Sequence, residues 1–225
     1  MKKLIATLAL LGTASACFAQ AYVSFFNASL TRVSTNGSAF GGGVGPTAAG
    51  PAGTWYYALL VAPTSQTTID ASLDGWTFVA MATNSGYGPG FMVGGEPGDS
   101  GVQVPGYPGL SYANFAVVGW SGNIGSDWNS IYAGRPTWLG PDYSGGASWA
   151  ALQEQPWNSI WYGVSSIAYD VQLASAPGPY NDVFGPSSYG LIDGMTLDPV
   201  LVPEPSVVAL AGISGALLFL RRKTR

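Results

Sequence analysis

Glycine and proline break the middle of this chain into segments that are too short for long helices. The 225 residues include 32 glycines and 16 prolines, and clusters of Gly, Pro, Asn, Asp and Ser separate short apolar and aromatic runs. These runs are continuous or alternate with polar residues, which is the pattern of β-strands. The predicted strands are Tyr22–Asn27, Trp55–Ala62, Trp76–Thr83, Ala113–Ser121, Ile160–Tyr169 and a short one near Met195.

Short strands joined by long loops predict one all-β domain over residues 20–199, an antiparallel β-sandwich of the jelly-roll type with glycine-rich loops. The longest predicted loops are Gly41–Gly53 and Gly86–Gly109. Two stretches are candidates for short helices: Ser126–Ala133, with Ser126 as an N-cap, and Ala147–Gln155. A length of about 180 residues suits a single domain with a sizeable core.

Histidine is absent from the chain, and Cys17 is the only cysteine. Because Cys17 lies in an N-terminal apolar segment, the predicted domain has neither a thiol nor an imidazole. Ser-His-Asp triads, Cys-His dyads, haem ligation by histidine and the usual zinc sites all need one of these groups. No spaced run of Asp and Asn resembles a calcium loop. The sequence therefore predicts a domain that is not an enzyme and that holds no metal and no cofactor.

Charged residues make up only 9% of the chain. Between Ala21 and Val202 the basic residues are Arg32 and Arg135, against eleven acidic residues. Such a surface repels phosphate and offers no basic patch, so nucleic acid is excluded as a partner. Gly, Ser, Asn and Tyr are expected to keep this surface soluble in place of ions.

The N-terminus has the three-part organisation of a secretory signal peptide, predicted at residues 1–19. Lys2 and Lys3 precede an apolar run that is too short to span a bilayer, and a small polar stretch follows it. Small residues at Cys17 and Ala19 occupy the positions that signal peptidase reads, so cleavage is predicted between Ala19 and Gln20. Lipid attachment at Cys17 is the alternative, although Ala14 stands where a lipoprotein signal has leucine.

The C-terminal segment, residues 202–225, combines a tripeptide, an apolar run and a basic cluster. Pro203, Glu204 and Pro205 precede the apolar run Val207–Leu220, which as a helix is about 21 Å long against a hydrocarbon core of about 30 Å. A helix this short suits a transient membrane segment. The basic cluster consists of Arg221, Arg222, Lys223 and Arg225. By the positive-inside rule it lies in the cytoplasm, with the domain outside.

This order of tripeptide, short membrane helix and basic tail closely resembles the PEP-CTERM sorting signal. The resemblance covers residues 202–225 and implies nothing about the function of the middle of the chain. It implies that Pro203, Glu204 and Pro205 are read by exosortase, a membrane-embedded cysteine protease or transpeptidase of Gram-negative bacteria that is often found with exopolysaccharide systems. The tail is thus expected to be its substrate.

Eight tryptophans fall in the middle of the chain, and two roles are open to them. Those in or against predicted strands, Trp55, Trp76, Trp120 and Trp161, are expected to fill the core. Sugar rings stack on exposed aromatic faces, so tryptophans near polar loops are candidates for a carbohydrate site. These candidates are Trp128, Trp138, Trp149 and Trp157, with Asn129, Asp142 and Asn158 as neighbours. Core packing or loop attachment is the favoured interpretation of these residues too.

A glycosidase needs two carboxylates across a cleft, so the acidic residues of the domain are candidates for that role. The candidates are Glu96, Asp99, Asp127, Asp142 and Glu154. None of them lies in a recognisable catalytic motif. Asp70, Asp74 and Asp193 stand beside turn residues, where carboxylates commonly serve a structural role.

These features predict an exported, noncatalytic envelope or extracellular-matrix protein. Its partners are expected to be the Sec translocon, signal peptidase, exosortase and, through the C-terminal helix, the inner membrane of the precursor. A carbohydrate-binding module that recognises exopolysaccharide is the alternative, and a glycoside hydrolase is a weaker one. After processing, the domain is expected in the cell envelope or outside the cell.

Overall fold

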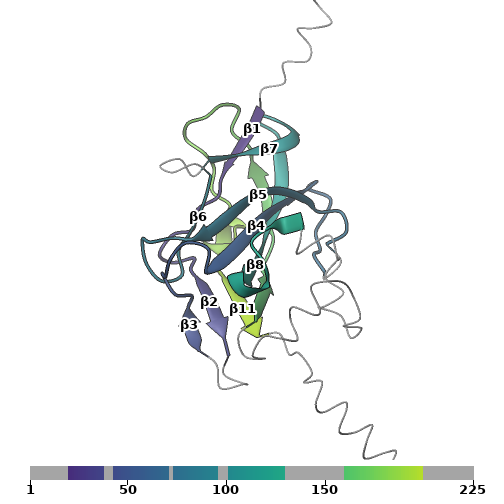
Figure 1. Cartoon of the computed structure of the whole chain (residues 1–225). Helices are drawn as coiled ribbons and strands as arrows, with labels where there is room; N and C mark the ends of the chain where they lie inside the picture. Colours follow the sequence, from purple (N-terminus) through teal and green to yellow (C-terminus); the bar gives the residue numbers. More distant parts are fainter. Residues whose placement is uncertain (1–19, 38–42, 71–72, 96–100, 130–159, 200–225) are drawn as a thin grey trace, which may run out of the picture.

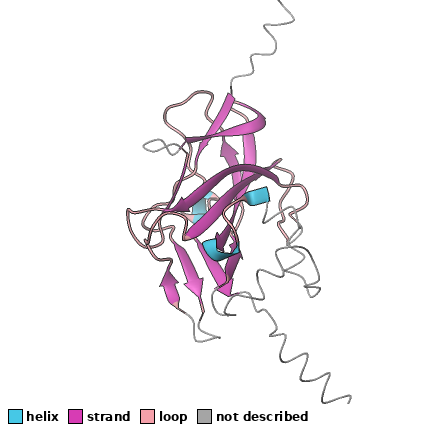
Figure 2. Ribbon diagram, viewed as in Figure 1, coloured by secondary structure: helices cyan, strands magenta, loops and turns pink. Residues whose placement is uncertain are grey.

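The computed structural model describes residues 20–37, 43–70, 73–95, 101–129 and 160–199, which form an all-β domain (Figure 1). The prediction of an all-β fold is therefore confirmed. Figure 2 shows a strongly curled sheet with loops around it. Two single-turn 3-10 helices lie among the described residues, η2 (Gly122–Ile124) and η4 (Ser187–Tyr189).

A nine-stranded sheet makes up most of the domain. Its order is β3-β2-β11-β9-β8-β4-β5-β6, and β10 pairs with β8 beside β9. The strands are β2 (Val33–Asn36), β3 (Val44–Pro46), β4 (Trp55–Ala62), β5 (Thr77–Asn84), β6 (Met92–Gly94), β8 (Tyr112–Ser121), β9 (Trp161–Val164), β10 (Ala168–Gln172) and β11 (Met195–Pro199). A separate two-stranded ribbon pairs β1 (Gln20–Ser24) with β7 (Gly101–Pro108). Figure 1 shows this ribbon at the end of the domain opposite β2 and β3.

Strands β4 and β8 form the centre of the sheet and are buried on both faces. They pair antiparallel from Trp55 opposite Ser121 to Ala62 opposite Asn114. Because successive side chains point to opposite faces, Tyr57, Leu59 and Val61 enter one hydrophobic cluster while Ala58 and Leu60 enter the other. The continuous apolar sequence of β4 follows from burial on both sides.

The first cluster lies between the curled sheet and the β1–β7 ribbon. It includes Val23 from β1, Val104 from β7 and Phe115 from β8. The second cluster, on the other face, contains Trp76, Trp120 and Trp128. Burial of this much apolar and aromatic surface is the main stabilising term for a domain with few ions.

Several predicted strands have nearly the observed limits. The strand predicted at Trp55–Ala62 coincides with β4, and those at Trp76–Thr83 and Ala113–Ser121 are each offset by one residue from β5 and β8 at one or both ends. The strand predicted at Tyr22–Asn27 is observed as β1, which begins and ends earlier. The short strand near Met195 is β11.

The strand predicted at Ile160–Tyr169 is divided into β9 and β10. Ser165 interrupts it, because its hydroxyl accepts a hydrogen bond of 2.9 Å from the Val117 N–H while its own N–H donates to the Val117 carbonyl at 2.8 Å. A side-chain oxygen thus replaces a backbone carbonyl in the ladder. The two halves still pair with the same edge of β8.

The two predicted glycine-rich loops are wrong as continuous loops, since they contain short strands. Gly41–Gly53 includes β3, and Gly86–Gly109 includes β6 and β7. In β7, Val102 and Val104 are buried while Gln103 is exposed. This alternation is the strand signal that the surrounding glycine and proline obscured.

A fully antiparallel arrangement was also predicted, and one strand pair differs. β11 runs parallel to β2, with Met195 opposite Val33 and Leu197 opposite Thr35. The other named strand pairs are antiparallel. β11 therefore joins the β2–β3 hairpin to the rest of the sheet, a connection that depends on residues far apart in the sequence.

The predicted helices lie largely outside the described residues. Of the candidate helix Ser126–Ala133, the described part is residues 126–129, in which Trp128 and Asn129 are helical. The stretch Ala147–Gln155 and both terminal helices fall outside the described ranges. Within those ranges, no helix has the length and apolar character needed to cross a membrane.

Candidate functional site

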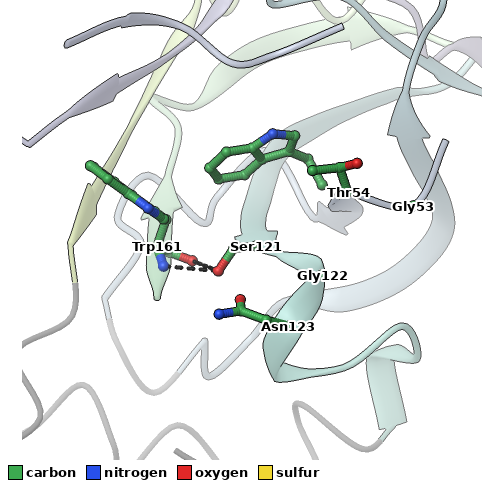
Figure 3. Close-up of a pocket in the computed structure, with 7 residues that line it drawn as sticks. Gly53, Thr54, Ser121, Gly122, Asn123 and Trp161 are labelled. Carbon is green, nitrogen blue, oxygen red and sulfur yellow. Dashed lines mark hydrogen bonds between the residues drawn. The ribbon is translucent and has the colours of Figure 1, made fainter. Parts of the chain in front are cut away.

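A pocket of about 270 Å³ lies at the end of the sheet where β4 begins, β8 ends and β9 begins. Its lining consists of Gly53, Thr54, Trp55, Ser121, Gly122, Asn123 and Trp161, shown in Figure 3. The antiparallel register brings these segments together, because Trp55 on β4 is the partner of Ser121 on β8. We refer to these seven residues as the Trp55–Trp161 pocket.

Ser121 joins β8 to β9 at the side of the pocket. Its hydroxyl accepts a hydrogen bond of 2.9 Å from the Trp161 N–H and lies 3.5 Å from the Trp161 carbonyl oxygen (Figure 3). On the opposite side, the Gly122 N–H donates to the Thr54 carbonyl at 2.8 Å. These bonds hold the three segments in one arrangement.

The loop before β4 is held by one buried side chain, that of Asn84. Its Oδ1 accepts a hydrogen bond of 3.0 Å from the Trp55 N–H, and its Nδ2 donates to the carbonyls of Gly50 and Pro51 at 3.1 and 3.0 Å. The Thr54 hydroxyl donates to the same Pro51 carbonyl at 2.8 Å. The wall of the pocket that Thr54 and Trp55 supply is therefore fixed before any ligand binds.

Two glycines of the pocket have no room for a side chain. Gly53 has φ +90, and a Cβ there would lie 2.8 Å from the Tyr56 hydroxyl. A Cβ on Gly122 would overlap the Gly53 carbonyl oxygen. Gly122 is thus required by the close approach of the two loops, and Gly53 by its positive φ.

The two tryptophans of the pocket meet edge to face, with ring centroids 6.5 Å apart and planes at 62°. Trp55 is 8% exposed and Trp161 is 9% exposed. The Nε1–H of Trp55 is buried, and no described residue accepts a hydrogen bond from it. A buried donor of this kind is rare in proteins and calls for an explanation.

None of the seven described residues that line the pocket is ionisable. Such a set offers hydroxyl, carboxamide, backbone and indole groups, which bind and orient rather than transfer protons at neutral pH. Elsewhere in the described ranges, no three metal-ligating side chains come together.

Of the four tryptophans proposed for a carbohydrate site, the structure describes Trp128. It is 6% exposed, and its ring stacks on Phe78 with centroids 5.5 Å apart and planes at 13°. The ring also lies 6.1 Å from that of Trp120. Trp128 is part of the second hydrophobic cluster, in agreement with the packing interpretation. Trp138, Trp149 and Trp157 lie outside the described residues.

The tryptophans expected in the core are indeed buried. Trp55, Trp76, Trp120 and Trp161 each belong to one of the two clusters. The indole N–H of Trp76 donates to the Thr68 carbonyl at 3.1 Å, and that of Trp120 donates to the Gly125 carbonyl at 2.8 Å.

Most of the other predicted site residues lie outside the described ranges. These are Ala19, the sorting tripeptide Pro203, Glu204 and Pro205, the basic tail Arg221, Arg222, Lys223 and Arg225, and the carboxylates Glu96, Asp99, Asp142 and Glu154. Gln20 is the first residue of β1. Asp127 is exposed.

Thr54, Ser121 and Asn123 were not predicted as site residues. Each lies within three residues of a tryptophan and beside a glycine: Thr54 and Trp55 follow Gly53, and Ser121, Gly122 and Asn123 follow Trp120. The same pattern of tryptophan next to a polar loop drew attention to Trp128 and Trp157. It could not show which loops meet, because that depends on the pairing of β4 with β8.

Comparison with known proteins yields no relative: no family model, no curated protein and no solved structure matches the chain.

Proposed function

We propose that this chain is an exported, noncatalytic protein of the cell envelope or extracellular matrix that exosortase sorts and processes through its C-terminal segment. The order of Pro203-Glu204-Pro205, a short apolar run and a basic cluster in residues 202–225 is the observation that carries the proposal. Export through the Sec translocon and removal of residues 1–19 by signal peptidase would precede processing. The membrane helix of the tail is transient in this scheme.

The named strands lie between the two predicted signals, from Gln20 in β1 to Pro199 in β11. Removal of either terminal segment at those points would leave every named strand intact. The assignment of the domain to a jelly-roll sandwich is part of the proposal.

Recognition of the tail must come from its tripeptide. The apolar helix supplies membrane residence and the basic cluster supplies topology, but neither is distinctive. Two prolines keep Glu204 in an extended backbone outside the bilayer, where a protease can bind it. A single carboxylate between two prolines is the feature that distinguishes this tail from other membrane tails.

The test is replacement of Pro203, Glu204 and Pro205 by alanine in a host that has exosortase. Export and membrane insertion should be unchanged, while the full-length tail accumulates in immunoblots of membrane fractions. The matched control replaces the next three residues, Ser206, Val207 and Val208, by alanine and should be processed normally. Processing of the tripeptide variant at the parental rate would disprove the sorting proposal.

Carbohydrate binding is the second candidate function, and the Trp55–Trp161 pocket is the observation that favours it. A neutral pocket with two indoles and several hydrogen-bonding groups has the composition of a small-molecule site. Exopolysaccharide is the partner expected from the resemblance of the tail. Glycoside hydrolysis gains no comparable support, because none of the described residues that line the pocket is a carboxylate.

A further inference from the structure

Arg32 is the only basic residue among the described residues, and none of the described carboxylates forms an ion pair with it. Its side chain is partly buried. The guanidinium lies over the ring of Phe91, with its Cζ 4.9 Å from the ring centroid. A charge that is partly removed from water normally has a counter-charge beside it, because burial of an ion without one is costly. Arg32 therefore calls for an anion.

The guanidinium has an enclosed side and an open side. Nε is fully buried, and no described residue accepts a hydrogen bond from it. Nη1 and Nη2 likewise have no partner among the described residues, but unlike Nε they are not fully buried. A ligand can therefore reach the two terminal nitrogens of Arg32 and not Nε. Two adjacent N–H donors in the plane of a guanidinium match the two oxygens of a carboxylate.

Three aromatic rings lead away from Arg32 to the surface. Phe91 stacks on Phe26 with centroids 6.4 Å apart and planes at 28°, and Phe26 meets Tyr87 edge to face at 6.3 Å. The two phenylalanines are partly buried, whereas Tyr87 is 78% exposed. An exposed tyrosine ring offers a flat apolar face on which the carbon–hydrogen face of a sugar ring packs. We refer to Arg32, Phe91, Phe26 and Tyr87 as the Arg32 site.

The two loops that carry the Arg32 site are joined by Asn27, which is fully buried. Its Nδ2 donates to the carbonyls of Thr31 and Gly90 at 2.9 and 2.8 Å. Its Oδ1 accepts a hydrogen bond of 2.8 Å from the Met92 N–H. Thr31 precedes Arg32 in the chain, and Gly90 and Met92 flank the phenylalanine under the guanidinium. The cation and the rings are therefore in place before a ligand binds, which lowers the cost of binding.

The charge of the domain restricts the kind of anion. Acidic residues far outnumber basic ones between Ala21 and Val202, so a densely charged polymer is repelled. Arg32 offers a single positive charge, which suits a single carboxylate. A carboxylate on a ring that also has an apolar face is the chemistry of a uronic acid, and neutral sugars on either side of it keep the charge density of the polymer low.

We infer that the Arg32 site binds a uronic acid unit of a polysaccharide. The carboxylate accepts hydrogen bonds from Nη1 and Nη2 of Arg32, and another unit of the same polysaccharide packs against Tyr87. The inference rests on carbohydrate binding, the second candidate function, and is independent of both the sorting proposal and the Trp55–Trp161 pocket.

The test measures binding to the full chain, held in a detergent without a sugar headgroup, by calorimetry and saturation-transfer NMR. The probes are methyl glucuronide and a tetrasaccharide in which glucuronate alternates with N-acetylglucosamine. Both should bind, and the tetrasaccharide with its carboxylates reduced to alcohols should not. Arg32→Met should weaken both probes by about tenfold or more, because it removes the charge and keeps the aliphatic contact with Phe91. Arg32→Lys should also weaken them, since it lacks the paired donors.

A stability measurement separates binding from a structural role of Arg32. Arg32→Met should leave the thermal unfolding midpoint of the free protein unchanged or higher, because the charge that it removes has no partner. A clear drop in that midpoint would show that Arg32 is paired within the chain, and would overturn the inference.

Tyr87→Ala should weaken the tetrasaccharide and leave methyl glucuronide unchanged, since a single unit bound at Arg32 does not extend to Tyr87. The matched control is Tyr189→Ala, at a position that is 77% exposed, and it should bind both probes like the parent.

Three results would overturn the inference: absence of binding, equal binding of the reduced tetrasaccharide, or binding that Arg32→Met does not weaken. In the last two cases, carbohydrate binding elsewhere on the domain would stand. Acetate that binds as tightly as methyl glucuronide would show a site for any small anion, and would overturn the assignment to a sugar.

Discussion

The side-chain oxygen of Asn84 accepts a hydrogen bond of 3.0 Å from the backbone N–H of Trp55. Asn84 ends β5 and Trp55 begins β4, so this bond closes the end of the sheet beside the pocket. The carboxamide nitrogen uses both of its hydrogens on the carbonyls of Gly50 and Pro51. One neutral side chain thereby satisfies three backbone groups of a loop that enters the sheet.

Two other buried asparagines make the same three bonds. Asn27 accepts from the Met92 N–H and donates to the carbonyls of Thr31 and Gly90. Asn114 accepts from the Asp170 N–H and donates to the carbonyls of Thr64 and Gln66. All three asparagines are at most 2% exposed. This domain has long loops and few ions. The three asparagines give hydrogen-bond partners to backbone groups of these loops, which hydrophobic contacts alone would leave without partners.

Asn84→Asp should lower the free energy of unfolding at pH 7 by about 2–4 kcal/mol. The carboxylate keeps the acceptor for Trp55 but cannot donate to Gly50 and Pro51, whose carbonyl oxygens then face a buried negative charge. Urea unfolding followed by tryptophan fluorescence measures the loss. Asn181→Asp is the control, because Asn181 is exposed and its side chain donates to the Gln172 carbonyl, so the loss of stability should be much smaller. Equal losses in the two variants would show that the Asn84 bonds do not stabilise the domain.

The sequence predicted the strands whose own residues determine them and missed those that depend on a partner. The limits of β4 followed from its continuous apolar run, Trp55–Ala62, because a strand buried on both faces needs apolar residues at each position. Strand β7 carries Gly101, Pro105, Gly106 and Pro108, and its identity as a strand depends on pairing with β1. The parallel contact of β11 with β2 likewise has no local signal.

The interpretation of asparagine needed correction for a related reason. Asparagine was expected to keep the surface soluble. Asn36, Asn129 and Asn181 are exposed, as expected, whereas Asn27, Asn84 and Asn114 are buried. Composition gives the number of asparagines. It does not show which of them are buried among the backbone groups of a distant loop. The pocket was missed in the same way, since Thr54 and Ser121 become neighbours only when β4 pairs with β8.

Gly163→Ala should destabilise the domain by about 1–3 kcal/mol. A Cβ on Gly163 would overlap the Thr196 carbonyl oxygen and lie 3.0 Å from the Leu197 Cδ2, so β9 and β11 would have to separate. Gly86→Ala is the control, because nothing lies within 4 Å of a Cβ there. Thermal unfolding should show a lower midpoint for Gly163→Ala and an unchanged or higher midpoint for Gly86→Ala. A neutral Gly163→Ala would argue against the close contact of the two strands.

Stability should fall above about pH 10, the ordinary pKa of tyrosine. Burial raises the pKa of Tyr57, and the contact with the Thr47 hydroxyl lowers it in part. Burial also raises the pKa of Tyr162. These phenols lose their protons more readily in the unfolded chain than in the folded one. Their contribution to the free energy of unfolding is therefore complete below pH 10 and is lost as the pH rises toward their pKa in the folded protein. The slope is at most about 1.4 kcal/mol per pH unit for each tyrosine.

Tyr57→Phe should therefore make the alkaline decline shallower, at a small cost at neutral pH from the lost contact with Thr47. Tyr189→Phe, at a position that is 77% exposed, should leave the decline as steep as in the parent. Urea unfolding at pH 8 to 11 compares the three proteins. An alkaline decline that is equally steep in Tyr57→Phe and the parent would contradict the assignment to Tyr57.

Chelation of metals should leave the unfolding midpoint unchanged. Histidine is absent and Cys17 precedes the domain, so metal binding would fall to carboxylates. In the described ranges these carboxylates form no cluster of three. Thermal unfolding with and without a chelator of divalent cations checks this. A clear drop in the midpoint would reveal a calcium site made by residues of the loops.

Mature protein from the native host should begin at Gln20. Signal peptidase selects small side chains at the third and first positions before the cut, which Cys17 and Ala19 provide, and it ignores Phe18 between them. The cut would keep Gln20 with the domain, where Gln20 pairs with Pro108 and its side chain accepts a hydrogen bond of 2.8 Å from the Tyr22 hydroxyl. Ala19→Leu should leave the precursor uncut, whereas Phe18→Leu should be cut like the parent. Mass spectrometry of the N-terminal peptide distinguishes the possibilities: a diacylglyceryl group on Cys17 at the N-terminus would establish the lipoprotein alternative and exclude cleavage before Gln20.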